Sequence, residues 1–478
     1  MIRTISHQLI KWYSKKNYEQ FCESLKNPKK AQIAILTNLT GISDYKDFKN
    51  HFPITNYADW KEGIEKRKVE KPQEHFVPTS GSTHAIKWIP YTKKFKDELW
   101  RASGAWIHDL YLRFPDIAKG THYWSLSWIP EDLRKEHRSN DLDFFAGLEK
   151  YLLEQTMTVD ESVSTMPTLK ESMRENAVSL IEKDVTLISV WSPTFLLELL
   201  DLVIADKNFF ADRILDFRKK EALKYADKVS PELCKILFPK LALISAWATS
   251  SSEYYAQKVK DLFPHVPFEA KGLWATEGVV TIPFQGKFPL AVNSHFYEFE
   301  DVETKEIHPG WALKKGMKVT PLLTTGSLFF RYRLNDLLLV SDFFDQTPCL
   351  TFLGRIGETD LVGEKISSDL AQKLISNIAN KYEISPLSLL AVEGHKPHYR
   401  LLVDGVGKLE RLDEISDFLE KELLGHFHYK LARELGQLSH VQVEMKEDAY
   451  QAYVKYREKM IALKGNIKVE PLVRTRDD

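Results

Sequence analysis

The sequence has few of the residues that would restrict it to a specialised class of protein. Only three cysteines, Cys22, Cys234 and Cys349, occur in 478 residues, and they lie far apart and outside any metal-ligand spacing. This excludes a disulfide framework and a cysteine-rich zinc site, and it favours a reducing compartment. A chain of this length can bury a sufficient core without such cross-links.

An excess of charge of either sign is also missing. Lys and Arg number 66 and Asp and Glu number 67, so the formal net charge is −1. A chain with this balance has no global field for holding nucleic acid or an anionic membrane. We therefore expect neither as a partner.

Long hydrophobic runs are absent as well. The N-terminal residues carry a polar side chain at every second or third position, which excludes a secretory signal there. The most apolar stretch, residues 185–205, contains two acids and is interrupted by Pro193. Because proline is tolerated in the first turn of a helix but not inside a membrane span, we interpret this stretch as a buried strand, residues 185–191, followed by a helix. The sequence predicts a soluble, cytoplasmic protein.

Hydrophobic periodicity indicates a layered α/β architecture. Apolar strand-like runs, such as residues 241–247, alternate with amphipathic helical patterns, such as residues 95–110. Short strands separated by turn residues predominate after residue 294, which predicts a β-rich subdomain. No internal repeat of fixed period is present.

A second, smaller α/β unit is predicted at the C-terminal end. Residues 342–356 become polar and contain glycine, and a helix at 367–382 and two further strands follow. We place the domain boundary near Gly354, which divides the chain into a large N-terminal domain, 1–353, and a small C-terminal domain, 354–478.

One segment concentrates hydroxyl groups around a glycine turn. The sequence VPTSGSTHAIKWIP, residues 77–90, offers Ser and Thr side chains and backbone N–H groups, which are the donors that a phosphate needs. It is not a P-loop, because Lys87 lacks the preceding glycine and the following hydroxyl. An ordinary surface turn rich in Ser and Thr is the alternative interpretation.

Three further positions have a functional and a structural interpretation. Thr276 and Glu277 lie between apolar residues in GLWATEGVV. The functional interpretation is a contact to Mg²⁺ or phosphate, and the structural one is a solvated turn. Asp336 interrupts the apolar run LFFRYRLNDLLLV. It is either an acceptor for the hydroxyls of a ribose or a turn residue. Lys468 follows a Gly-Asn turn near the C-terminus, where most lysines are simply solvated.

Taken together, these segments resemble the adenylate-forming superfamily, and within it the acyl-acid amido synthetases, a family of auxin-responsive plant proteins and bacterial relatives. The resemblance covers nearly the whole chain. It is carried by ordered blocks: FPITNYADWKEGIEK, PTSGSTHAIKWIPYT, KLALISAW, KGLWATEGVVTIPF, SHFYEFE, LTTGSLFFRYRLNDLLLV, FLGRIGETDLVGEKIS and GNIKVEP. The fold implied is a large adenylate-forming domain with a β-rich subdomain, followed by a small mobile domain.

The resemblance implies a role for each block. The loop that wraps the β- and γ-phosphates of ATP would consist of Thr79, Ser80, Gly81, Ser82 and Thr83. Thr276 and Glu277 would contact the α-phosphate, with Glu277 also a ligand of Mg²⁺.

The remaining roles concern the nucleoside and the adenylation step. Phe296 would lie against the adenine, although core packing in a strand is an equally good interpretation of this residue. Asp336 would bind the ribose, and Arg355 would help to hold the nucleotide near the hinge. Lys468, on the small domain, would reach the α-phosphate during adenylation and withdraw for the second step.

The implied enzyme is an acid–amino acid ligase. It would join a carboxylic acid to ATP as an acyl-adenylate with release of pyrophosphate, and then form an amide with an amino acid and release AMP. Two alternatives stay open. In the first, the acyl group goes to a thiol of coenzyme A or of a carrier protein. In the second, the protein is a silent nucleotide- or acid-binding protein, an interpretation favoured by His84 and Ala85, which depart from the glycine usual in the phosphate loop.

The sequence gives only an outline of the acid pocket. We expect it between the phosphate loop, the helix at 95–113 and the WATEG block, and the nearby aromatic residues favour an apolar acid. Arg101 or Arg113 is a candidate partner for the substrate carboxylate, with surface solvation the favoured interpretation of both.

Overall fold

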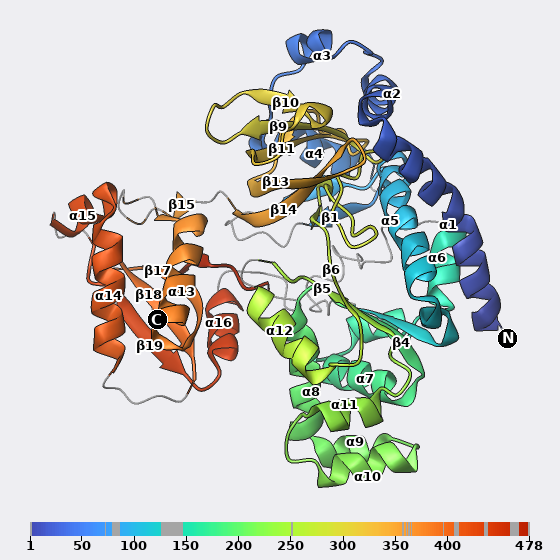
Figure 1. Ribbon diagram of the computed structural model, residues 1–478, viewed down its shortest axis with the longest axis vertical. Coiled ribbons are helices and arrows are strands. Elements are labelled where there is room, and N and C mark those ends of the chain that lie inside the picture. The colour runs from blue at the N-terminus through green and yellow to red at the C-terminus, as the bar shows by residue number, and fades with distance from the viewer. Residues whose placement is uncertain are drawn as a thin grey trace.

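The computed structural model describes residues 2–476 apart from residues 72, 79–86, 126–146, 250–251, 356–357, 360, 362–363, 365, 395, 406–410, 435–437 and 459–467. Figure 1 shows two bodies: a large one that contains the N-terminus, and a smaller one that consists of the C-terminal elements. In the described part of the chain, no helix combines the length and the apolar character that a membrane span requires.

Helices form most of the first seventy residues. They are α1 (Ile2–Lys26), α2 (Pro28–Thr40), α3 (Tyr45–His51) and α4 (Tyr57–Glu70). Asn27, Asp44 and Asn56 cap the last three, because each side chain accepts a backbone N–H of the first turn. Helix α1 lies alongside α5 (Lys93–Arg113), which covers the interior of the large body (Figure 1).

A parallel sheet with the order β3-β4-β5-β6 forms the lower half of the large body in Figure 1. Its strands are β3 (Thr121–Trp124), β4 (Val185–Ser189), β5 (Leu243–Ala246) and β6 (Phe268–Ala270). All residues of β4 and β5 are buried, which is typical of a parallel sheet that is covered on both faces. The predicted strand and its following helix are confirmed: α8 (Pro193–Ala205) starts with Pro193 in its first turn.

Helices separate these strands along the chain, which confirms the α/β alternation. They are α6 (Gly147–Glu154), α7 (Leu169–Glu182), α9 (Lys207–Arg213), α10 (Phe217–Tyr225), α11 (Pro231–Leu237) and α12 (Glu253–Leu262), with the 3-10 helices η1 (Pro115–Lys119) and η4 (Glu161–Thr165).

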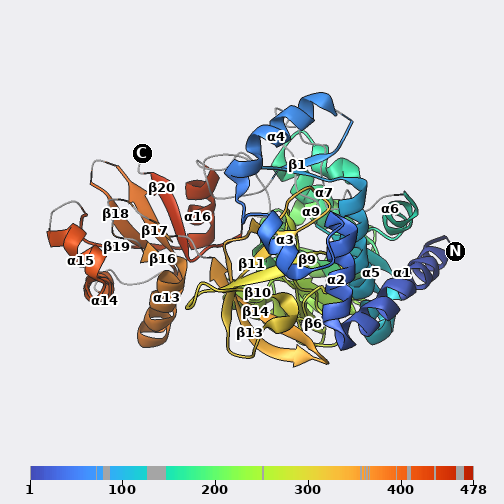
Figure 2. The same ribbon diagram turned by 90° about the horizontal axis from the view of Figure 1, so that it is seen from above.

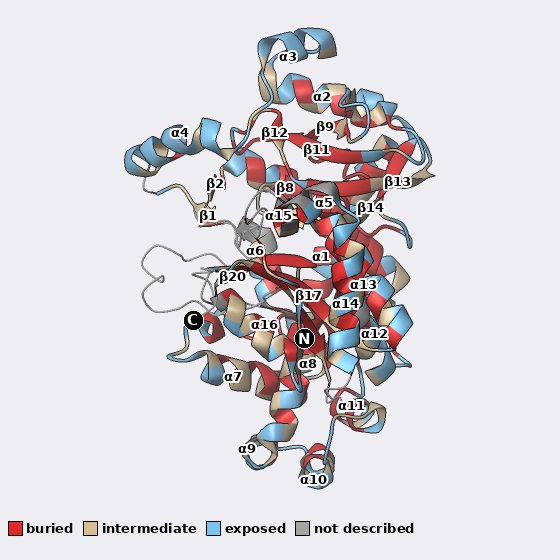
Figure 3. Cartoon of the chain, turned by 90° about the vertical axis from the view of Figure 1, so that its left-hand side faces the viewer, coloured by how far each residue is buried: buried red, intermediate tan, exposed pale blue. Residues whose placement is uncertain are grey.

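A second sheet, largely antiparallel, is the β-rich subdomain expected after residue 294. Its order is β10-β9-β11-β13-β14, with β12 paired to β11. The strands are β9 (Phe296–Asp301), β10 (Ile307–Pro309), β11 (Lys318–Thr324), β12 (Tyr332–Arg333), β13 (Asp336–Phe344) and β14 (Thr347–Arg355), and η6 (Gly310–Ala312) follows β10. Its central strands are buried (Figure 3).

The polar, glycine-containing segment before the predicted boundary belongs to this sheet. Residues 342–355 comprise the end of β13 and the whole of β14, which pair as an antiparallel hairpin. The tight turn between Phe344 and Thr347 contains Asp345 at a φ of 50°, a conformation that Asp tolerates better than most residues. Asp345 and Gln346 therefore mark a turn within the sheet.

Three two-stranded sheets connect the larger layers. They are β1 (Phe76–Pro78) with β2 (Trp88–Pro90), β7 (Trp274–Ala275) with β8 (Gly278–Val279), and β15 (Glu358–Thr359) with β16 (Ile366–Ser367).

The C-terminal elements form a four-stranded sheet with helices beside it, seen as a separate lobe in Figure 2. The strands, in the order β19-β18-β17-β20, are β17 (Ser385–Glu393), β18 (His398–Asp404), β19 (Gln442–Lys446) and β20 (Leu472–Arg476). The helices are α13 (Ser368–Tyr382), α14 (Leu412–Leu424), α15 (Phe427–Glu434) and α16 (Ala449–Glu458). The lobe has its own core, and the last strand of the preceding sheet ends at Arg355. The division into 1–353 and 354–478 stays a prediction.

The two bodies meet where α8 and α12 face α16. Tyr255 of α12 is buried in a cluster with residues of the C-terminal sheet, and its ring lies 6.2 Å from that of Tyr450. Gln451 donates to Glu198 at 2.9 Å. This contact fixes how the end of the chain approaches the large body.

Candidate active site

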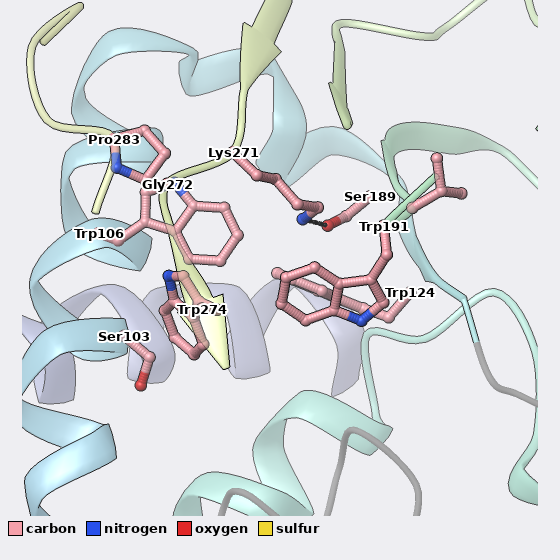
Figure 4. Close-up of a pocket in the computed structure, with 10 residues that line it drawn as sticks. Ser103, Trp106, Trp124, Ser189, Trp191, Lys271, Gly272, Trp274 and Pro283 are labelled. Carbon is pink, nitrogen blue, oxygen red and sulfur yellow. Dashed lines mark hydrogen bonds between the residues drawn. The ribbon is translucent and has the colours of Figure 1, made fainter. Parts of the chain in front are cut away.

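A cavity of about 40 Å³ lies at the carboxyl edge of the parallel sheet (Figure 4). Trp124 ends β3, Trp191 follows β4 and Trp274 begins β7 soon after β6, and all three line it together with Trp106 of α5. Ligands bind outside the carboxyl ends of the strands in open α/β sheets, so this is the expected place for a substrate.

The polar side of this cavity is Lys271, which follows β6. Its Nζ donates to Ser189 Oγ at 2.7 Å and lies 5.0 Å from the ring centroid of Trp106 and 4.9 Å from that of Trp191. Figure 4 shows the lysine side chain extending from the strand end towards Ser189. Lys271 belongs to the KGLWATEG block, but its sequence context gave no sign of this role.

Thr276 and Glu277 form the turn between β7 and β8, directly after the residues that line the cavity. Tyr91 donates through its hydroxyl to the Thr276 carbonyl at 3.1 Å, and the Tyr332 hydroxyl lies 3.5 Å from Glu277 Oε1. Thr276 and Glu277 are both half-buried, which leaves them accessible to a ligand.

A buried pair that the sequence did not reveal supports this turn. His295 accepts the Val279 N–H on Nε2 at 3.2 Å, so its Nδ1 carries the proton that it donates to Glu98 at 2.7 Å. Gly278 adjoins the same imidazole at a φ of +156°, and a Cβ there would lie 3.0 Å from His295 Nε2. Glycine next to Glu277 is therefore required by the close approach of the ring.

Asp336 and Arg355, two predicted nucleotide contacts nineteen positions apart, are brought together by the second sheet. They face each other in the register of β13 and β14. Asp336 is only 3% exposed. The strand pairing thus makes these two residues neighbours, as a shared contribution to one site requires.

Phe296 occupies a different environment from the one that the resemblance implies. Its side chain is fully buried, and its ring lies 5.3 Å from that of Phe48 and 6.2 Å from those of Tyr45 and Trp311. These partners enclose it beneath α2 and α3. The environment matches the alternative interpretation, core packing in a strand.

Lys468, from the segment before β20, lies against the large body. Its Nζ is 4.8 Å from the ring centroid of Trp247, which follows β5, and 4.6 Å from that of Phe352 in β14. Trp247 in turn lies 5.5 Å from Trp191 of the cavity. The ammonium group of the C-terminal segment therefore sits between the two sheets of the large body, next to the cavity wall.

The predicted phosphate loop, Thr79, Ser80, Gly81, Ser82 and Thr83, lies outside the described residues, as do His84 and Ala85. The strands on either side of it, β1 and β2, pair in antiparallel register. The Trp88 N–H donates to the Tyr57 hydroxyl at 2.7 Å, which ties β2 to α4.

Neither arginine considered for the substrate carboxylate lines the cavity. Arg101 donates to the carbonyls of Asn293 and Ser294 at 2.7 and 3.0 Å. Arg113 pairs with Asp109 and Glu269. Both guanidinium groups thus serve internal contacts, so the favoured surface interpretation was wrong and the substrate role is unsupported.

The residues around Glu277 fit a magnesium ion that is bound mainly by its nucleotide. No group of three His, Cys, Asp or Glu side chains in the described ranges is arranged to hold a metal by itself. Mg²⁺ usually binds proteins through one or two carboxylates and takes its other ligands from phosphates and water. A single accessible carboxylate meets this need.

The parallel sheet with a cavity at its carboxyl edge, the antiparallel sheet beside it and the C-terminal α/β lobe form the mixed α/β fold of a large N-terminal body and a smaller C-terminal one that the sequence predicts. Residues 8–268 match the GH3 family N-terminal domain, and residues 288–355 match the GH3 family central domain. The chain belongs to the GH3 family.

Two solved structures resemble the whole chain. One, described as AtGH3.15 acyl acid amido synthetase in complex with 2,4-DB, is 16% identical with a TM-score of 0.74, and the match covers 98% of this chain and 94% of that one. Another GH3.15 acyl acid amido synthetase structure is 15% identical with a TM-score of 0.70, with 96% and 91% covered. No match was found among curated proteins. At these identities the likeness concerns the fold.

Proposed function

We propose that this chain is an ATP-dependent acid–amino acid ligase. In the first step a carboxylate oxygen of the acid attacks the α-phosphorus of ATP, the bond to the β-phosphate breaks, and pyrophosphate leaves. In the second step the amino nitrogen of an amino acid attacks the acyl carbon, AMP leaves, and the amine proton passes to solvent. Membership of the GH3 family and the likeness to two acyl acid amido synthetases support this reaction.

The observation that carries the proposal is the position of Lys468. The first step brings an anion to a polyanion, so it needs cations that act where the charge develops. Lys468 contacts Trp247, whose ring adjoins the cavity beside the Thr276–Glu277 turn. An acid in the cavity would then have its carboxylate between that turn and the ammonium group.

The other predicted residues have supporting roles in this proposal. Asp336 accepts hydrogen bonds from the ribose hydroxyls, and Arg355 holds the nucleotide from the neighbouring strand. Thr79, Ser80, Gly81, Ser82 and Thr83 bind the β- and γ-phosphates. Glu277 and the phosphates would hold Mg²⁺, which would supply positive charge to neutralise the polyanion. Phe296 is not used, because its ring is enclosed by the core.

The amine acceptor and the location in the cell are also part of the proposal. An amine acceptor is favoured over coenzyme A because both similar structures are those of acyl acid amido synthetases, and we propose that the amine is that of an amino acid. A cytoplasmic location stays a prediction from the sequence.

Exchange of labelled pyrophosphate into ATP, driven by a panel of carboxylic acids, tests the first step. Mass spectrometry of the products with amino acids or coenzyme A tests the second. Exchange with an amide as the product is the expected result. A coenzyme A thioester as the only product would replace the amide route, and no exchange with any acid would favour a silent binding protein.

A further inference from the structure

The cavity contains a cation among aromatic walls. Lys271 Nζ lies within 6 Å of the ring centroids of Trp106, Trp124 and Trp191, at 5.0, 5.9 and 4.9 Å. The lysine is 9% exposed. In a site that excludes water, an ammonium group attracts an anion far more strongly than it does at the surface.

A second hydrogen-bond donor lines the same cavity. The indole Nε1 of Trp124 is buried, and it has no hydrogen-bond partner among the described residues. Buried indole N–H groups usually find an acceptor. By contrast, Trp106 Nε1 donates to Glu269 at 3.1 Å, so that indole is already satisfied.

The strand register places these donors together. Trp124 of β3 is the cross-strand partner of Ser189 in β4, and Ser189 Oγ accepts from Lys271 Nζ. Glu269, the nearest carboxylate in sequence, is engaged by Arg113 and Trp106. An ammonium group, a hydroxyl and an indole N–H thus converge on one small cavity with flat apolar walls.

Lys271 and Lys468, the cation assigned to the reacting end, contact different aromatic rings. Lys271 and the Thr276–Glu277 turn are separated by Gly272 and the first strand of the β7–β8 hairpin. Lys271 Nζ lies over Trp191, Lys468 Nζ lies over Trp247, and these two rings are 5.5 Å apart. A carboxylate that reacts near Lys468 therefore leaves Lys271 facing the far end of the acid.

We infer that the acid carries a second anionic group, and that Lys271 and Trp124 Nε1 bind it. The substrate class is a dicarboxylic acid with a flat or short apolar body. This inference rests on the proposed function, because it assigns the cavity to the acid. It assigns Lys271 to specificity and not to the chemical step.

Matched acids test this inference in the pyrophosphate exchange assay. The pairs are benzene-1,4-dicarboxylate with 4-methylbenzoate, and glutarate with pentanoate. Each pair differs chiefly in the distal charge. We expect kcat/KM for at least one diacid to exceed that of its monocarboxylate partner by about 10-fold or more, as a hydrogen-bonded charge pair in a buried site provides.

Variants then assign the preference to the subsite. Lys271→Met should abolish it, Lys271→Arg should restore part of it, and Trp124→Phe should reduce it several-fold. Lys219→Met is the matched control, because Lys219 is another buried lysine, which donates to the Ile181 carbonyl away from the cavity. This control should keep the preference.

Two results would overturn the inference. One is equal or better exchange with the monocarboxylates than with the diacids in the wild type. The other is an equal loss for both members of a pair in Lys271→Met, which would mean that Lys271 holds the reacting carboxylate or only supports the fold.

Binding measured without ATP separates this inference from the proposed function. Stabilisation of the wild type but not of Lys271→Met by a diacid in a thermal shift assay, without exchange, would support the subsite and reject the ligase. Exchange with the monocarboxylates only would support the ligase and reject the subsite. If no diacid stabilises the protein or supports exchange, the subsite is also rejected.

Discussion

Lys468 Nζ lies 4.8 Å from the ring centroid of Trp247, so a residue ten positions from the C-terminus contacts the loop that follows the third strand of the parallel sheet. The Tyr453 hydroxyl donates to the Lys468 carbonyl at 3.1 Å and thereby anchors the segment on α16. The small lobe thus positions this ammonium group, and any movement of the lobe would move it.

Lys468→Ala should slow acyl-adenylate formation by about 10² to 10³, since a single electrostatic contact to the transition state has this magnitude. Amide formation from acyl-adenylate that is supplied ready-made should be spared, because the lysine acts in the first step. Rapid-quench measurement of the two half-reactions checks this. Lys421→Ala, at an exposed position of α14, is the control. Equal slowing of both half-reactions would argue against withdrawal of the lysine between them.

Asp336→Ala should weaken ATP binding by about 5- to 150-fold, since a hydrogen-bonded contact to a buried acceptor is worth about 1 to 3 kcal/mol. Calorimetric titration with ATP checks the affinity, and a urea unfolding curve checks that the variant is folded. Asp417→Ala, on the exposed face of α14, should leave the affinity unchanged. An unaltered ATP affinity in folded Asp336→Ala would remove this residue from the site.

Phe296→Ala should destabilise the protein by about 3 to 5 kcal/mol, because it leaves a cavity in a fully packed aromatic cluster. ATP affinity of the folded variant should be close to that of the wild type. Urea unfolding and calorimetry measure the two effects. Phe217→Ala, an exposed position, provides the control. Unchanged stability together with weaker ATP binding would restore Phe296 to the adenine site.

The buried histidines of α1 and β3 should make the protein sensitive to acid. Burial lowers the pKa of His122 to about 3, and burial also lowers the pKa of His7, whose ring lies 4.7 Å away. Below about pH 6.5 the histidines of the unfolded chain take up protons that these folded side chains do not. The free energy of unfolding therefore decreases as the pH is lowered.

The expected slope is up to about 1.4 kcal/mol per pH unit for each histidine. Urea unfolding at pH 7.5, 6.5 and 5.5 measures it. His122→Gln should make the dependence shallower, whereas His426→Gln, at an exposed position, should not. Identical pH profiles for wild type and His122→Gln would contradict the assignment.

Alkylation of cysteine under native conditions should leave pyrophosphate exchange intact. Burial raises the pKa of Cys234 to about 12 and that of Cys349 to about 11, so both stay protonated thiols at neutral pH and are unreactive. Lys235 adjoins Cys234 in the sequence, but burial keeps the Cys234 thiol protonated. Iodoacetamide treatment followed by mass spectrometry and the exchange assay checks the expectation. Loss of activity on modification of a single thiol in folded protein would reopen a covalent mechanism.

Several features of the fold could be predicted from local sequence. The helix after Pro193 begins there because a proline at the first helical position loses no hydrogen bond. The strands of the parallel sheet were recognised as apolar runs between helices, because they are buried on both faces. The hairpin of β13 and β14 was missed, because a two-residue polar turn has the same composition as a linker.

The sequence by itself determined the class of fold and the family, since these depend on periodicity and ordered blocks. Only the tertiary structure decided which residues share a site. The register of β13 and β14 brought Asp336 to Arg355, and α2 and α3 enclosed Phe296. Most importantly, the carboxyl ends of separate strands gathered Lys271, Ser189 and three tryptophans around one cavity. Strand pairing over more than a hundred residues creates that neighbourhood, and no local pattern around Lys271 contains it.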